Sequence, residues 1–209
     1  MTTSDDTYHY YEPATGHGLA HDPLNSIVGP RPIGWVSTLG SSGVRNLAPY
    51  SFFNLFCYKP PILGFCSTSP KDSLRNARET GEFVWNLATR DLAERMNVTS
   101  GPVPYEVDEF ELAGLTPAPS RHVRAARVAE SGVNFECKVT DVLNLKTLAG
   151  TPTNSWVVFG EVVAVHIRRS LLKEGLFDTF GAGVILRGGG PSAYAVITPE
   201  SRFDLERPR

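Results

Sequence analysis

The chain lacks any hydrophobic run long enough to cross a membrane as a helix, so its 209 residues predict no spanning segment. Cysteine is scarce as well: Cys57, Cys66 and Cys137 form no C-x-x-C pair, and each stands in an apolar segment. We therefore expect three reduced, buried thiols in a cytoplasmic protein and no metal site. The opening residues, MTTSDDTYHYYEP, are polar and acidic, unlike a signal peptide.

Positive charge is also sparse. Lys and Arg number 20 against 22 Asp and Glu, which gives a formal net charge of −2. The densest basic cluster, residues 121–127, contains only three arginines and one histidine. A nucleic-acid footprint would need a stronger basic stripe, so we interpret this cluster as a solvated loop or strand edge. With 41% hydrophobic residues, the chain is long and apolar enough to fold around a core.

The hydrophobic pattern predicts a fold made mainly of strands. A tight turn at Gly40–Gly43 joins two short runs that read as a hairpin, and β-branched or alternating runs follow. Gly160 interrupts the last long run and marks a bend or bulge. The expected strands are residues 33–39, 44–48, 62–68, 133–148 and 156–167.

Few helices are expected. Ser69 is a candidate cap, Pro70 suits a first helical position and Gly81 suits the stop. Residues 90–98 predict a second short helix, and the Pro-rich residues 100–122 read as an excursion. Because helices and strands do not alternate, a β-barrel with helical decorations fits better than a doubly wound fold.

The chain is expected to divide into an N-terminal arm, residues 1–25, and one domain, residues 26–209. The arm would wrap over the domain or over a partner subunit. It contains His9, His17 and His21, whose spacing has no helical or strand logic. We therefore expect surface or hydrogen-bonding histidines here rather than metal ligands.

The hexapeptide TSPKDS follows a predicted buried strand and opens a predicted helix. Free backbone N–H groups and the helix dipole favour an anion there, and Lys71, Ser69 and Ser73 could add donors. The alternative is an ordinary capped helix start with Asp72 complementing the dipole. The hexapeptide alone favours that alternative, because Ser-Pro helix starts are common.

Two further segments could line a ligand. In NLAPYSFFN, Ser51 and Asn54 offer polar contacts and the neighbouring rings offer walls for a planar heterocycle, although plain core packing is favoured on this segment alone. In RGGGPSAY, Arg187 could bind a phosphate or an anionic ring edge, and a flexible turn before a last strand explains the segment equally well. The segment is not a dinucleotide fingerprint.

The sequence has no recognisable motif for acid–base or nucleophilic catalysis. The chain has no G-x-S-x-G elbow and no H-E-x-x-H motif, and His166 in its β-branched run reads as structural. We therefore expect no catalytic side chain. Phosphate contacts with a ring pocket suit a cofactor that carries its own reactivity.

Together these segments resemble the flavin reductase-like family, over about residues 20–195. The resemblance implies a six-stranded FMN-binding split β-barrel of Greek-key type with a few short helices, and a homodimer with FMN near the subunit interface. The segments that carry it are RPIGWVST, NLAPYSFFN, ILGFCSTSPKDSLRNARETGEFVWNL, GVNFECKV, FGEVVAVHI and RGGGPSAY.

The resemblance also implies a set of cofactor-binding residues. Those expected beside the isoalloxazine, or approaching it from the first hairpin, are Ser37, Thr38, Ala48, Ser51, Phe52 and Asn54. Those expected around the ribityl-phosphate end, or closing the pocket from the C-terminal side, are Ser67, Lys71, Asp72, Ser73, Arg187 and Tyr194.

The function implied is that of an FMN-dependent NAD(P)H:flavin oxidoreductase, which passes electrons to flavin or through bound FMN to another acceptor, such as an oxygenase. No acid or arginine can be assigned to a ribose 2′ position, so NADH and NADPH are both candidate donors. Two alternatives stay open: a flavoredoxin-like electron carrier without fast NAD(P)H chemistry, and a split barrel that holds another planar ligand. Neither nucleic acid nor membrane is expected as a partner.

Overall fold

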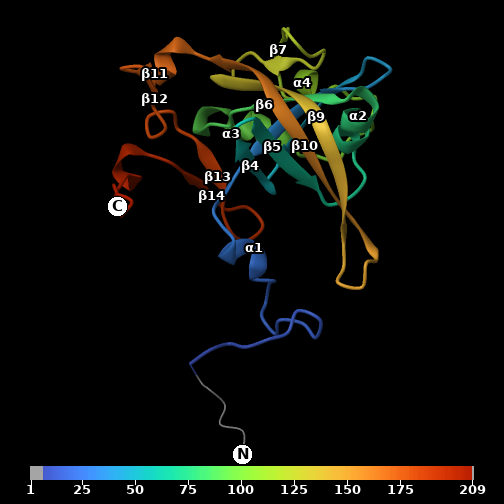
Figure 1. The fold of residues 1–209 in the computed structure, drawn as a ribbon, viewed down its shortest axis with the longest axis vertical. Helices are drawn as coiled ribbons and strands as arrows, with labels where there is room; N and C mark the ends of the chain where they lie inside the picture. The colour runs from blue at the N-terminus through green and yellow to red at the C-terminus, as the bar shows by residue number, and fades with distance from the viewer. Residues whose placement is uncertain (1–6, 209) are drawn as a thin grey trace, which may run out of the picture.

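The computed structural model describes residues 7–208, and most of its regular structure is strand (Figure 1). Seven antiparallel strands form the main sheet in the order β3-β2-β6-β9-β10-β5-β4. Their bounds are β2 (Gly34–Leu39), β3 (Arg45–Tyr50), β4 (Phe53–Tyr58), β5 (Pro61–Ser67), β6 (Glu82–Asn86), β9 (Val133–Lys146) and β10 (Pro152–Ile167). The predicted mainly-β fold is confirmed, with seven strands in this sheet where the resemblance implied a barrel of six.

Three small sheets accompany the main one. They are built from β1 (Arg31–Pro32) with β13 (Ile185–Arg187) and β14 (Tyr194–Val196), β7 (Pro117–Ala118) with β8 (Arg127–Val128), and β11 (Leu172–Lys173) with β12 (Leu176–Phe177). The first of these carries the glycine-rich segment as the turn between β13 and β14. Its position explains why RGGGPSAY reads as a turn before a last strand.

The strand predictions are largely confirmed. The predicted hairpin is β2–β3, and the two alternating runs are the long strands β9 and β10. The β9–β10 register shifts between Phe159 and Gly160, which confirms the predicted irregularity. The helices differ more: they are α1 (Leu24–Ile27), α2 (Asp72–Thr80), α3 (Ala93–Val98) and α4 (Glu109–Leu112), with 3₁₀ turns η1 (Arg90–Leu92), η2 (Arg169–Leu171) and η3 (Pro199–Ser201).

Helix α2 begins two residues later than its sequence predicts. Lys71 has an extended backbone (φ −130°, ψ 170°), so Ser69 and Pro70 precede the helix instead of capping and opening it. The predicted stop is confirmed, since Gly81 has φ 69° and donates its N–H to the carbonyl of Ala77 at 3.0 Å. The predicted helix over residues 90–98 is a 3₁₀ turn followed by α3. Among residues 7–208 no helix is long and apolar enough to cross a membrane.

The core lies on both faces of β2, because successive strand side chains point in opposite directions. Trp35 packs in one cluster with Leu92, Met96 and Phe110 from the helical segments. Val36 packs in the other with Phe65, Phe83 and Leu74, from β5, β6 and α2. Strand β2 therefore holds α2 against one face of the sheet and the α3–α4 region against the other.

Three glycines of the sheet lie directly under aromatic rings. A Cβ on Gly34 would lie 2.6 Å from the Phe53 ring, and one on Gly64 would lie 2.8 Å from Phe56. A Cβ on Gly160 would overlap the ring of Phe83, which is fully buried. Glycine is required at these positions by close packing, since none of them has a positive φ.

The N-terminal residues that the structure describes, 7–23, extend away from the sheets (Figure 1). They make no wrap over the domain, and Tyr8 and Tyr10 are 77% and 80% exposed; a wrap over a partner subunit stays a prediction. All three thiols are free, as predicted, but only Cys137 is buried, while Cys57 and Cys66 are half-buried.

Candidate functional site

A cavity of about 660 Å³ lies where the end of β3, the start of α2 and the segment after α3 meet. Its volume is in the range that small-molecule and cofactor sites occupy. Tyr50, Ser51 and Phe52 form one part of its wall, and Lys71, Asp72 and Ser73 form another. The two segments in which sequence analysis sought a ring wall and a phosphate cradle thus face the same space.

The start of α2 supplies donors to this cavity. The first N–H groups of a helix have no partner within the helix, and the dipole adds positive potential there. The Lys71 side chain is exposed, and among the described residues it makes no hydrogen bond or ion pair. Asp72, which also lines the cavity, lies 3.5 Å from Arg75 in an ion pair that offsets part of its negative charge. This end of the cavity is suited to an anion.

A buried hydrogen-bond network holds the cavity floor. Asn46 Nδ2 donates to Ser73 Oγ at 2.8 Å and to Thr38 Oγ1 at 3.2 Å. Asn76 Nδ2 also donates to Thr38 Oγ1, at 3.1 Å. Thr38 is therefore a support that fixes Asn46, and Asn46 in turn fixes the Ser73 hydroxyl at the start of α2.

Tyr50 presents a polar atom that this network leaves out. Its hydroxyl is the one buried side-chain N or O atom within residues 7–208 that has no hydrogen-bond partner. Burial raises the pKa of Tyr50 to about 12, and the nearby hydroxyls of Ser73 and Ser67 offset part of that rise. Unpartnered buried polar groups are costly, which marks the floor of this cavity as a place built for more than packing.

Glu109 brings a carboxyl group to the same cavity. Its Oε2 accepts the backbone N–H of Leu47 at 3.0 Å, and the residue is only 6% exposed. Burial raises its pKa, and the neighbouring charges of Asp72 and Asp108 raise it further. Helix α4 is held in place by Arg45, which pairs with Asp108 at 2.5 Å.

The ring wall is anchored from β1. Arg31 Nε donates to the carbonyl of Ser51 at 3.1 Å, and the Arg31 guanidinium lies 5.3 Å from the centre of the Phe52 ring. The Phe52 side chain is 42% exposed, so its ring is available to a ligand. The cavity therefore combines a lysine and a helix start at one end with a partly aromatic wall. Within residues 7–208 no three His, Cys, Asp or Glu side chains gather to hold a metal.

The family model for the flavin reductase like domain matches residues 29–183, most of the chain. The chain belongs to the flavin reductase-like family. Two similar relatives, both described as uncharacterized proteins, are each 39% identical. The one from Aquifex aeolicus aligns over 72% of this chain and 76% of its own length, and BH2278 from Halalkalibacterium halodurans aligns over 88% and 89%.

Solved structures share this fold. Nitrilotriacetate monooxygenase component B from Bacillus cereus superposes with a TM-score of 0.81 at 29% identity, over 90% of this chain and 98% of its own. The 2-nitrobenzoate 2-nitroreductase NbaA from Pseudomonas fluorescens gives 0.77 at 31% identity, over 88% of both chains. A flavin reductase from Shewanella frigidimarina, described with a split barrel domain, gives 0.76 at 23% identity over 88% and 90%, which supports the predicted fold class.

In this flavin reductase-like protein, six of the twelve expected cofactor-binding residues line the cavity: Ala48, Ser51, Phe52, Lys71, Asp72 and Ser73. Three others are buried behind it. Thr38 supports Asn46, the Ser37 hydroxyl donates to the carbonyl of Ala126, and the Ser67 hydroxyl donates to the carbonyl of Ser69 at 2.7 Å.

The remaining three expected residues lie outside the cavity lining. Asn54 uses its side-chain oxygen to accept the N–H of Leu55 at 2.8 Å. Arg187 and Tyr194 face each other across β13 and β14, and the Arg187 guanidinium donates to three carbonyls of the intervening turn. In this arrangement Arg187 holds the glycine-rich turn, and its role toward a cofactor stays a prediction.

Sequence analysis missed two parts of the lining. Glu109 belongs to the excursion at residues 100–122, where the one local signal was Asp108, which caps α4 by accepting the N–H of Phe110 at 2.9 Å. Residues 99–103 reach the cavity because Thr99 Oγ1 accepts a hydrogen bond from Trp35 Nε1 at 3.0 Å. The hydrogen bonds that bring these parts to the cavity, from Leu47 to Glu109 and from Trp35 to Thr99, each join residues more than 60 positions apart, so no local pattern indicates them.

Proposed function

We propose that this protein binds FMN in the cavity at the start of α2 and transfers electrons from NADH or NADPH to flavin, or through bound FMN to another acceptor. The observation that carries the proposal is the continuity of the cavity from Lys71 and α2 to the wall at Ser51 and Phe52. FMN has a phosphate at one end and a planar ring at the other, which matches this polarity. The residues present therefore fit the cofactor that the family implies.

The residues of the chain would bind and orient. Lys71 and the first N–H groups of α2 would hold the phosphate, and Ser73, fixed by Asn46, would add a hydroxyl. Phe52 and Ser51 would border the ring. When bound, FMN supplies the capacity to accept and donate hydride, so the site needs no side chain of its own for that chemistry. The contribution of the protein is orientation and a fixed polar environment.

A visible spectrum tests this proposal directly. The purified protein is mixed with FMN, freed of unbound flavin, and recorded before and after NADH is added without oxygen. Retained yellow colour that NADH bleaches would support the reductase. Colour that only a chemical reductant removes would favour the electron-carrier alternative. Failure to retain flavin, together with no NADH turnover on free FMN, would reject both and favour another planar ligand.

The phosphate role of Lys71 has its own test. Lys71→Ala removes a charged donor that no described residue satisfies, and a charge-assisted hydrogen bond contributes about 1.5–3 kcal/mol, less where water competes. We therefore expect FMN affinity to fall roughly tenfold, with little change in the rate of hydride transfer at saturating FMN. Lys146→Ala, an exposed lysine on β9 away from the cavity, is the matched control. Equal FMN affinity in both variants would reject the assignment.

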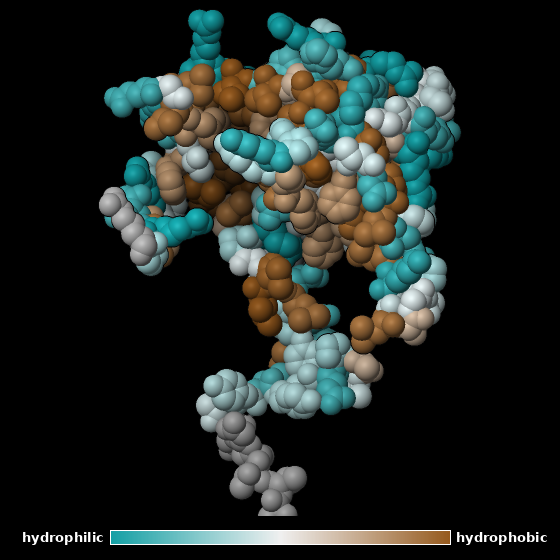
Figure 2. Space-filling model, in the orientation of Figure 1, coloured by the Kyte–Doolittle hydropathy of each residue, from teal (hydrophilic) through white to brown (hydrophobic). Residues whose placement is uncertain are grey.

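We further propose a homodimer in the cytoplasm. The support is apolar surface on β4, an edge strand of the main sheet: Leu55, Phe56 and Tyr58 are 46%, 61% and 77% exposed. Figure 2 shows apolar side chains gathered on the face where β10 runs in Figure 1. Static light scattering checks the dimer, and a monomer at micromolar concentration would refute it.

We also propose that the chain divides into an arm, residues 1–25, and a domain, residues 26–209.

The electron acceptor is proposed to be an oxygenase or a comparable partner. The similar structure at 29% identity is component B of a nitrilotriacetate monooxygenase, which suggests a reductase that serves a second protein. Steady NADH oxidation with free FMN as acceptor would support such a role, because reduced flavin would then be available to a partner. NADH oxidation that needs a dye and ignores free FMN would contradict it.

A further inference from the structure

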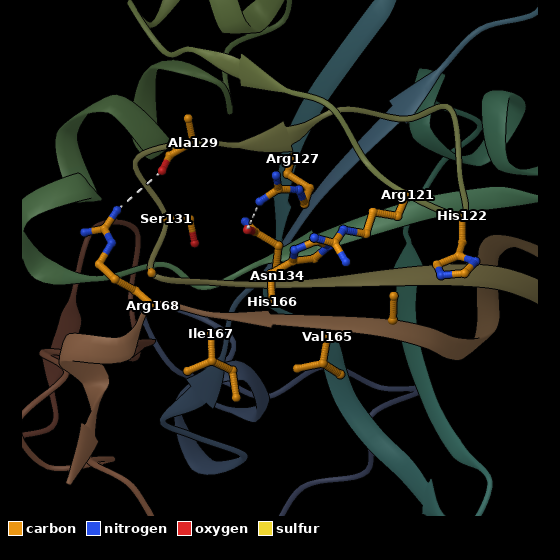
Figure 3. Close-up of a pocket in the computed structure, with 12 residues that line it drawn as sticks. Arg121, His122, Arg127, Ala129, Ser131, Asn134, Val165, His166, Ile167 and Arg168 are labelled. Carbon is orange, nitrogen blue, oxygen red and sulfur yellow. Dashed lines mark hydrogen bonds between the residues drawn. The ribbon is translucent and has the colours of Figure 1, made fainter. Parts of the chain in front are cut away.

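A second cavity, of about 530 Å³, lies where β9 begins and β10 ends, beside the loop that leads into β8 (Figure 3). Five of its lining residues are basic or can become so: Arg121, His122, Arg127, His166 and Arg168. Within residues 7–208 no aspartate or glutamate lines it. The formal net charge of the chain is −2, yet three arginines and no carboxylate line this cavity. Positive charge is therefore concentrated here.

Two of the arginines are held in place and keep unused donors. Arg127 donates from Nε to the carbonyl of Pro119 and from Nη1 to Asn134 Oδ1, both at 3.1 Å. Arg168 donates from Nη2 to the carbonyl of Glu130 at 3.0 Å. Within residues 7–208, Arg127 Nη2 and Arg168 Nη1 donate to no atom. These guanidinium groups are therefore oriented before any ligand arrives, which lowers the cost of binding.

Two other basic side chains have no partner in the described part of the chain. The backbone N–H groups of Arg121 and His122 donate to Glu136 at 2.9 and 2.6 Å, which fixes the loop. The Arg121 guanidinium and the His122 ring make no hydrogen bond or ion pair with residues 7–208. Figure 3 shows the Arg121 side chain extending toward Arg127.

The carboxylates nearest the cavity are already engaged. Glu136 is fully buried beneath the loop, where it lies 2.6 Å from His166 Nε2. The Glu130 carboxylate accepts the N–H of Thr116 at 3.1 Å and lies 3.7 Å from Arg95. Neither group is free to neutralise Arg121 or Arg127, so the cavity keeps an excess of positive charge.

We propose that this cavity is a second ligand site, which binds a phosphate-bearing anion of the pyrophosphate class. Guanidinium groups match the oxygen geometry of phosphate and can bind it through paired hydrogen bonds. Arg121 and Arg127 lie on one side of Ser131 and Arg168 lies on the other (Figure 3), so a ligand with more than one phosphate group suits this cavity better than a single phosphate. The site is independent of the FMN proposal, and either can fail without the other.

Calorimetric titration with inorganic pyrophosphate at low ionic strength tests the site. Arg121→Gln removes a guanidinium that supports no other contact, so the variant should fold, and pyrophosphate affinity should fall roughly ten- to hundredfold. Arg90→Gln, which removes an exposed arginine outside both cavities, should bind as the wild type does. His122→Gln provides a second variant in the same loop, with a smaller expected loss.

Two comparisons distinguish binding in this cavity from binding at the start of α2 and from general attraction of anions. Lys71→Ala should keep pyrophosphate binding and lose FMN affinity, while Arg121→Gln should do the reverse. Pyrophosphate binding that disappears in Lys71→Ala but survives in Arg121→Gln would overturn the proposal, and so would no binding to the wild type. Citrate that binds as tightly as pyrophosphate would overturn the phosphate assignment, because carboxylates would then satisfy the site equally.

Discussion

Replacing Glu136 by glutamine is expected to lower the free energy of unfolding at pH 7 by about 3 kcal/mol. The carboxylate accepts the backbone N–H groups of Arg121, His122 and Val123 at 2.6–3.2 Å and lies 2.6 Å from His166 Nε2. Glutamine has the same shape but no charge, and one end of its amide can only donate. Some of the backbone N–H groups that now donate to the carboxylate would then face the N–H group of the glutamine amide instead of an acceptor.

The magnitude follows from the pKa of Glu136. Burial alone would raise it, but the hydrogen bond from His166 and those from the backbone of Arg121 and His122 outweigh burial and lower the pKa from 4.5 to about 2. A difference of one pKa unit corresponds to 1.36 kcal/mol, so this lowering contributes about 3 kcal/mol. Because the folded-state pKa is the lower one, the stabilisation is complete above pH 4.5 and is lost as the pH falls through 2.

Urea denaturation at pH 7 and pH 3 measures both features. The difference between wild type and Glu136→Gln should be about 3 kcal/mol at pH 7 and roughly half of that at pH 3. The control is Glu161→Gln on the neighbouring strand, since Glu161 makes no side-chain hydrogen bond or ion pair with residues 7–208 and should change stability by less than about 0.5 kcal/mol. A loss below 1 kcal/mol at pH 7, or an equal loss at both pH values, would refute the reasoning.

Three other substitutions have expected outcomes measurable by the same denaturation assay. Tyr50→Phe removes an unpartnered buried hydroxyl and should raise the free energy of unfolding by about 1 kcal/mol, whereas a loss of that size would show that the hydroxyl has a partner. Gly160→Ala should cost roughly 1–3 kcal/mol because its Cβ overlaps Phe83, and an unchanged midpoint would contradict that packing. Glu109→Gln keeps an acceptor for Leu47 and should be more stable than wild type at pH 8, since a raised pKa makes the ionised carboxyl unfavourable as pH rises. That gain should vanish below pH 4.5, and a gain that persists there would point to a different cause.

Local patterns predicted the strands well because each strand must bury one face. The alternation in residues 133–148 and the β-branched run at 156–167 correspond to β9 and β10, and even the irregularity at Gly160 is present. The start of α2 was misjudged because Ser69 and Pro70 look like a cap and a first turn. The backbone at Lys71 is extended instead, so the helix begins at Asp72.

The sequence predicted only part of the candidate site. The segments at Ser51 and Lys71, predicted as a ring wall and a phosphate cradle, were recognisable in the sequence, and the fold places them around one cavity. Glu109 was not recognisable, because its relation to the cavity depends on a hydrogen bond to Leu47, 62 positions away. The basic loop at residues 121–127 is solvated as interpreted, with Arg121, His122 and Arg124 exposed, but a sequence cannot show that Glu136 binds the backbone of this loop.

The rings that rest on bare glycine also constrain how this sequence can change over generations. At Gly64 and Gly160 an added methyl group fits only if the facing phenylalanine shrinks or moves, and a smaller ring partner leaves a void while the glycine is still there. Each single substitution of the glycine or of the phenylalanine therefore gives a less stable protein, and only both substitutions together restore the packing. Such positions should change together or not at all among relatives, so glycine and phenylalanine at these sites are inherited as one unit.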